Sequence, residues 1–225
     1  MTKPTPDFSD LRGLTEAVNA FSDAVQRGDR ILLIAGSGSG AVAIASRAVG
    51  LMPEMTKAEA SQVSAVQDDA GMRTTGRRPF RAPHHTCSWA GMFTQTRSFT
   101  DDEGNAFKRK IPGEVALAKH GVLLLDEATE FRSHILSCVG TVLEDSTLLI
   151  ARVLPCPCGM AAHPHKSRCT CTEAQRDRWG VRVAVLRSLL EITYTIEVPF
   201  LSNETRAHGE RCPSTSDLLS AGGAK

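Results

Sequence analysis

Short apolar runs alternate with amphipathic stretches along this chain. Three of these runs, at residues 30–35, 121–125 and 148–154, have the length of strands buried on both faces of a parallel sheet, and a last strand is predicted at 192–198. Apolar residues recur at helical spacing in the intervening stretches 14–27, 41–51, 132–143 and 172–190. Strands that alternate with helices predict an α/β fold, in which helices cover both faces of a parallel sheet.

The regions outside this pattern are polar. We expect residues 1–7 to be a loose leader and residues 200–225, rich in Ser, Thr and Gly, to be a disordered tail. The core is therefore predicted at 8–199, with a Cys-rich insert at 155–171. The polar stretch 94–110 is expected to be a solvated excursion from this core.

Composition narrows the possible partners. The chain has 225 residues and a formal net charge of +1, so any contact with DNA must come from a local basic patch. No run approaches the roughly 18 apolar residues of a membrane span, and the amino terminus lacks the apolar core of a signal peptide. The sequence predicts a cytoplasmic protein without membrane contact.

A glycine loop follows the first predicted strand. It reads Gly36-Ser37-Gly38-Ser39-Gly40, and a predicted helix comes next. Glycines let backbone N–H groups approach a phosphate, but the complete phosphate-binding loop continues with Lys and then Ser or Thr. This chain has Ala41 and Val42 at those positions. A dinucleotide fingerprint also fits the glycines but lacks its acid at the end of the next strand, and a turn without ligand remains an alternative.

Two acids, Asp126 and Glu127, end the apolar run 121–125. Open α/β sheets bind ligands at the carboxyl ends of their strands. An Asp at this position can hold Mg²⁺ through water, and a following Glu can polarise an attacking water. We therefore take both as candidate catalytic residues, and two solvated acids as the alternative.

Four of the seven cysteines lie close together in the sequence, at Cys156, Cys158, Cys169 and Cys171. Such clustering favours a metal over a secreted disulfide framework, and four thiolates suffice for a tetrahedral structural Zn²⁺. The spacing is C-x-C rather than the usual C-x₂-C. His163 or His165 is therefore a possible replacement ligand, and surface thiols or disulfides are the alternatives.

Several motifs together resemble one family. They are Arg78-Pro-Phe-Arg-Ala-Pro-His-His-Thr86, Pro112-Gly-Glu-Val-Ala-Leu-Ala118, Gly121-Val-Leu-Leu-Leu-Asp-Glu127 and Pro155-Cys-Pro-Cys-Gly159. In this order they resemble the magnesium-chelatase-like branch of the AAA+ ATPases, of the ComM (YifB) competence-helicase type. The resemblance implies a three-layer αβα P-loop-type sheet that binds ATP and Mg²⁺ and assembles into a ring. Asp126 and Glu127 would be the Walker B pair. The resemblance also makes DNA a possible partner.

The departures from this family matter for its chemistry. No helical lid is recognisable after the last predicted strand, and the usual Walker A Lys and Thr, sensor Asn and Asp-Arg pair are replaced by Ala41, Val42, Leu154, Leu190 and Glu191. Without these groups phosphoryl transfer loses most of its charge stabilisation. We therefore expect ATP and Mg²⁺ binding to be weak or lost, and the chain to be a ring subunit or regulator. An active DNA translocase and a zinc-organised interaction module are the alternatives.

Overall fold

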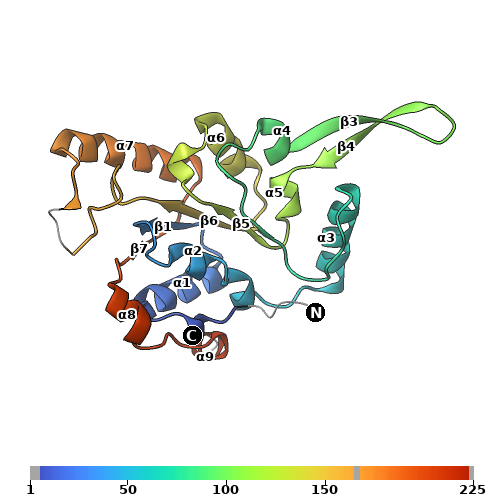
Figure 1. The fold of residues 1–225 in the computed structure, drawn as a ribbon. Helices are drawn as coiled ribbons and strands as arrows, with labels where there is room; N and C mark the ends of the chain where they lie inside the picture. Colours follow the sequence, from blue (N-terminus) through green and yellow to red (C-terminus); the bar gives the residue numbers. More distant parts are fainter. Residues whose placement is uncertain (1–5, 165–167, 223–225) are drawn as a thin grey trace.

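The computed structural model describes residues 6–164 and 168–222, so residues 1–5 of the expected leader lie outside it (Figure 1). Its centre is a parallel five-stranded sheet in the order β2-β5-β6-β1-β7. The strands are β1 (Ile31–Ala35), β2 (Phe80–Arg81), β5 (Val122–Leu125), β6 (Leu148–Val153) and β7 (Tyr194–Val198). The four strands predicted from the sequence are confirmed, whereas the two-residue β2 is too short to leave a sequence pattern.

Helices cover both faces of the sheet, as Figure 1 shows. Alternate strand residues pack on α1 (Thr15–Arg27), α2 (Ala41–Ala45) and a short 3₁₀ turn, η2 (Ala48–Leu51), on one side. The others pack on η3 (Ala128–Glu130), α6 (Ser133–Val142) and α7 (Glu173–Leu189) on the opposite side. In β1, β5 and β6 nearly all side chains on both faces are buried, which explains why these runs are almost continuously apolar, whereas the edge strand β7 alternates and exposes Glu197. This confirms the predicted three-layer αβα fold.

The helices α6 and α7 approach each other closely at Gly140. A Cβ atom added there would lie 1.9 Å from the backbone oxygen of Leu189. Arg30 connects the same helix ends, since its guanidinium donates to the carbonyl oxygens of Gly140 (2.9 Å) and Leu190 (3.3 Å). Close packing and this cation hold the two carboxyl-terminal helix ends together.

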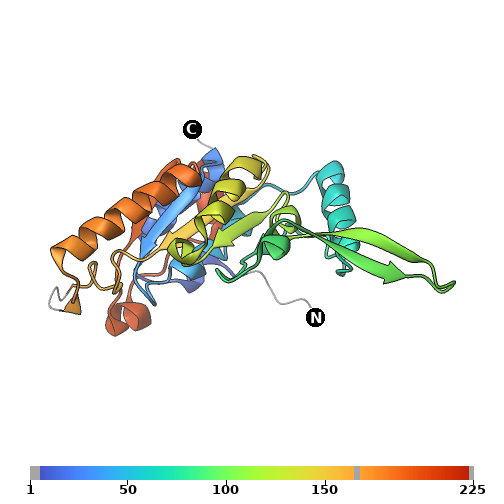
Figure 2. The same ribbon diagram turned by 90° about the horizontal axis from the view of Figure 1, so that it is seen from above.

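The stretch expected to be a solvated excursion is a regular β-hairpin that projects from the body (Figures 1 and 2). Its strands β3 (Thr94–Thr100) and β4 (Ala106–Pro112) are antiparallel, with Phe99 opposite Phe107. The Asp101 carboxylate closes the turn by accepting the N–H groups of Glu103 and Asn105. The helices α3 (Lys57–Asp69), α4 (Trp89–Met92) and α5 (Glu114–Leu117) surround its base.

The prediction of a disordered tail at 200–225 is wrong for the residues described. The segment contains α8 (Asn203–His208) and α9 (Thr215–Gly222), and it buries Leu201, Cys212 and Leu218 in the same cluster as α1. These apolar residues are too widely spaced to produce a helical pattern in the sequence. The carboxylate of Asp7, placed in the expected leader, accepts the N–H of Thr215 at 3.1 Å and so joins both ends of the chain.

No helix within residues 6–164 and 168–222 is long and apolar enough to cross a membrane.

Candidate functional site

The glycine loop connects β1 to α2 and requires its glycines. Gly38 and Gly40 have φ values of +71° and +94°, which side chains strongly disfavour. A Cβ atom on Gly40 would also lie 2.8 Å from the Leu14 side chain. The loop and the first residues of α2 line a cavity of about 350 Å³ together with Arg152. The loop therefore keeps the shape of a phosphate cradle.

The cradle lacks the groups that usually complete it. Ala41 is buried in the core under the loop, and Val42 is 44% exposed, so neither offers a cation or a hydroxyl. The backbone can approach a phosphate, but the charge must come from another element.

The charged residue that lines this cavity is Arg152 on β6, the strand between β1 and β5. Its Nε pairs with the Asp126 carboxylate, and its Nη1 donates to the carbonyl oxygen of Ala35 at 3.4 Å. Its Nη2 lies 3.9 Å from Glu127 Oε1. The buried Arg152 thus lies between the glycine loop and the acidic pair, at the carboxyl ends of the strands.

Magnesium does not fit the residues present. It requires oxygen ligands in a nearly ideal octahedron, usually one or two carboxylates with water and phosphate oxygens. Asp126 is already paired with Arg152, and position 42 has no hydroxyl. A metal at Asp126 would have to displace the guanidinium of Arg152, a residue that is only 7% exposed.

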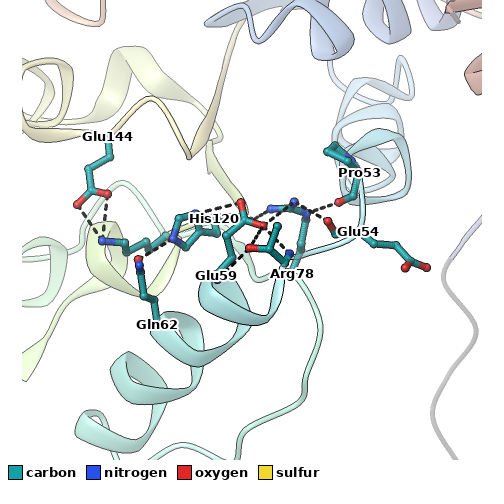
Figure 3. A network of polar contacts seen from close by, with 9 residues as sticks. Pro53, Glu54, Glu59, Gln62, Arg78, His120 and Glu144 are labelled. Carbon is teal, nitrogen blue, oxygen red and sulfur yellow. Dashed lines mark hydrogen bonds and ion pairs between the residues drawn. The ribbon is translucent and has the colours of Figure 1, made fainter.

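The segment Arg78–Thr86 is one of the motifs that carry the family resemblance. Figure 3 shows its first arginine in a structural network. The Arg78 guanidinium donates to the carbonyl oxygens of Pro53 (2.6 Å) and His120 (2.5 Å) and lies 3.7 Å from Glu59. The His120 ring in turn contacts Gln62 Oε1 at 2.8 Å. This network attaches α3 to the start of β5 at a distance from the cradle.

The rest of that segment leads toward the acidic pair. Arg81 makes a two-pronged contact with Glu114 at 2.6 and 2.7 Å, and this bonding raises the pKa of Arg81. His85 Nδ1 lies 3.3 Å from Glu127 Oε2. One of the paired histidines therefore belongs to the candidate site.

Sequence reasoning missed two residues of this site, Arg152 and Arg206. Arg152 is the one charge inside the apolar run 148–154, a signal that could have been read. Arg206 on α8 lies against the loop, with Nη2 3.5 Å from where a Cβ of Gly38 would be. No sequence pattern pointed to Arg206, because the polar segment around it predicted a disordered tail.

A larger cavity of about 860 Å³ lies beside the loop, between the start of α1, the end of β7 and the Cys-rich insert. Leu14, Pro155 and Glu197 are among its lining residues. Leu14 also borders Gly40, which places this cavity next to the cradle.

The four clustered cysteines lie together in space. Their sulfurs are all within 4.8 Å of one another. The separations are 3.4 Å for Cys156–Cys158, 3.9 Å for Cys156–Cys169 and 3.7 Å for Cys158–Cys169. Four sulfurs about 2.3 Å from a tetrahedral Zn²⁺ would be about 3.8 Å apart. The set, which includes Cys171, therefore fits zinc, with no position left for substrate.

The chemistry of these thiols is uneven. Burial opposes ionisation of Cys158, but bonding from the Met160 N–H and from Cys171 lowers its pKa to about 6. Burial and the bond to Cys158 raise the pKa of Cys171 to about 12. His163 packs on the Phe200 ring at 4.2 Å rather than joining the sulfurs, and His165 lies outside the described residues.

The parallel αβα sheet, glycine loop and acidic strand end define a protein of the P-loop AAA+ class. The chain belongs to the family described as magnesium chelatase, subunit ChlI, whose sequence model matches residues 7–154.

Relatives agree with this membership. The chain is 35% identical over 154 residues to competence protein ComM of Haemophilus influenzae, which covers 67% of this chain and 28% of that protein. It is 31% identical over 150 residues to the uncharacterized protein YifB of Escherichia coli, with 65% and 28% covered. For the uncharacterized protein Mb2921c of Mycobacterium bovis the identity is 30% over 194 residues, with 77% and 36% covered. The chain thus spans about a third or less of these relatives.

Among solved structures, the chain is similar to NtrX from Brucella abortus in complex with ATP. The TM-score is 0.45 at 16% identity, and the match covers 85% of this chain and 37% of that chain.

Proposed function

We propose that this chain is a magnesium-chelatase-like AAA+ module that holds a nucleotide weakly and does not hydrolyse it at a useful rate. It would act as a subunit or regulator in an AAA+ ring. The observation that carries this proposal is the pairing of Asp126, the expected metal-holding acid, with the buried Arg152. The acid that should position magnesium is occupied by the protein itself.

The missing groups each remove a separate contribution to catalysis. A single electrostatic donor to the transition state is worth roughly 10²–10³ in rate. Ala41, Val42 and Leu154 supply neither charge nor a hydrogen bond from their side chains. Losses of this size in one site outweigh the retained Glu127.

The test is steady-state ATP turnover by the purified chain with Mg²⁺. We expect no turnover above that of the Glu127→Gln variant, and we expect Ala41→Lys with Val42→Thr to raise nucleotide affinity. Brisk turnover by the wild type that Glu127→Gln abolishes would refute the proposal.

A contact with single-stranded DNA is a second candidate function, and the hairpin favours it. Phe99 and Phe107 stack with ring centroids 5.7 Å apart and stay 38% and 48% exposed. On the same face Arg97 lies directly opposite Arg109, a like-charge pair that costs stability. Exposed aromatic rings beside arginines suit stacked bases and backbone phosphates. Arg109 is also held by Asp69 at 3.2 Å.

Fluorescence anisotropy with a labelled single-stranded oligonucleotide tests this candidate. We expect salt-sensitive binding that the double change Phe99→Ala with Phe107→Ala weakens by at least about tenfold, since each stacked base contributes roughly 1–3 kcal/mol. Val181→Ala, which removes another exposed apolar side chain, is the control. Equal binding by both variants would exclude the hairpin as the contact.

The proposed zinc is structural and orders the insert after β6. Trp179 on α7 holds the start of the insert, because its Nε1–H donates to the carbonyl oxygen of Leu154 at 2.9 Å. A reducing compartment would keep the four thiols available for metal, which supports a cytoplasmic location.

A further inference from the structure

Arg152 is unusual for a charged residue because it stands in the middle strand of the sheet and is 7% exposed. Two of its nitrogens are occupied, by Asp126 and by the Ala35 carbonyl. The third, Nη2, has only the 3.9 Å contact to Glu127 among the described residues, which is longer than a hydrogen bond. The side chain lines the cavity of the glycine loop. A buried cation with free donors thus borders the cradle.

We propose that Arg152 takes the place of both the divalent metal and the loop lysine, so that this site binds a triphosphate chain without Mg²⁺. The inference rests on the proposed nucleotide binding and specifies that this binding does not depend on Mg²⁺. The glycine backbone contributes N–H donors and Arg152 contributes the positive charge.

Competition for Asp126 explains why magnesium would not help. A Mg²⁺ ion can bind Asp126 only if the guanidinium leaves, and Arg152 would then lose its main partner inside the protein. If both cations stayed, they would repel each other at close range. Neither arrangement gains affinity from the metal.

Arg206 offers a second cation on the outer side of the loop. It belongs to α8, is exposed, and has its guanidinium 5.9 Å from the centre of the Phe200 ring. Arg152 lines one cavity at the loop and Arg206 lines another, so two arginines from distant parts of the chain border the loop. An arginine fork suits phosphate oxygens well.

Isothermal titration of the full chain with ATP and with tripolyphosphate, each in EDTA and in excess Mg²⁺, tests the inference. We expect both probes to bind in EDTA, with dissociation constants that change less than about threefold on adding Mg²⁺. Arg152→Ala should weaken binding of both probes in EDTA by roughly tenfold to a hundredfold, the value of one or two charge-assisted hydrogen bonds. Arg152→Lys should retain part of the affinity, and Arg187→Gln, an exposed arginine on α7, all of it.

Tighter wild-type binding of ATP in Mg²⁺ by tenfold or more would overturn the inference, as would unchanged binding by a folded Arg152→Ala variant or no binding of either probe. The comparison of EDTA with Mg²⁺ uses the wild-type chain and stands even if a variant misfolds. ATP binding that requires Mg²⁺, without ATP turnover, would refute this inference alone. Brisk ATP turnover would refute the proposed function.

Discussion

Replacing Asp126 by Asn tests whether that acid is a structural partner of Arg152. A fully buried ion pair that loses one member costs about 3–5 kcal/mol, and an exposed pair about 0–1 kcal/mol. Arg152 is 9% exposed in its side chain but Asp126 is 39% exposed, so water replaces part of the lost contact. Asn also keeps an acceptor oxygen. We therefore expect a loss of about 1–2 kcal/mol in the free energy of unfolding.

Urea denaturation and thermal melting of the ligand-free protein measure this loss. For a chain of this size about 1–2 kcal/mol corresponds to a fall of roughly 2–8 °C in melting temperature. Glu127→Gln is the matched control, because its carboxylate lies 3.9 Å from Arg152 and is 47% exposed, and it should shift the melting temperature far less. In a double-mutant cycle, Asp126→Asn should cost little once Arg152 has been changed to Met.

A solvated acid would give the opposite result. Asp126 and Glu127 are adjacent in sequence, so removing one charge from two unpaired carboxylates would leave stability unchanged or raise it. An Asp126→Asn variant that melts at or above the wild-type temperature would therefore refute the assignment of Asp126 as the partner of Arg152.

Three further predictions follow from contacts elsewhere. Gly140→Ala should destabilise the fold by about 2–3 kcal/mol in urea, because the clash with the Leu189 carbonyl outweighs the better helix propensity of Ala, and a stabilised variant would contradict this packing. Protein purified under reducing conditions should contain about one zinc per chain by elemental analysis, and Cys158→Ser should lower it; less than about half an equivalent in the wild type would argue against the site. Burial opposes ionisation of Asp7, but bonds from Ser9 and Thr215 hold its pKa well below the ordinary 3.8, so Asp7→Asn should cost about 1 kcal/mol at neutral pH. Because this carboxylate stabilises the fold only when ionised, the gap should close as pH falls through the native pKa of Asp7, and a pH-independent gap would count against it.

Local pattern was sufficient for four of the five strands of the main sheet and for part of the candidate site. The apolar runs of β1, β5 and β6 are visible because both faces of these strands are covered, and the two helices that follow the glycine loop and the acidic pair show helical spacing. The four cysteines can also be recognised as a cluster from the sequence, since they are close in sequence as well as in space. By contrast, the hairpin at 94–112 was missed because its residues are almost all polar or exposed, so no buried face produces an alternating pattern.

The sequence by itself determined what this protein lacks: a cation at Ala41 and a hydroxyl at Val42 are absent whatever the fold does. Only the tertiary structure decided what occupies Asp126, because Arg152 lies 26 positions away and reaches it through the pairing of β5 with β6. The same holds for Arg206, which meets the glycine loop only after α8 has packed. The sequence gives the chemistry of each side chain. The contacts between charged side chains depend on strand order and long-range packing, which no local pattern records.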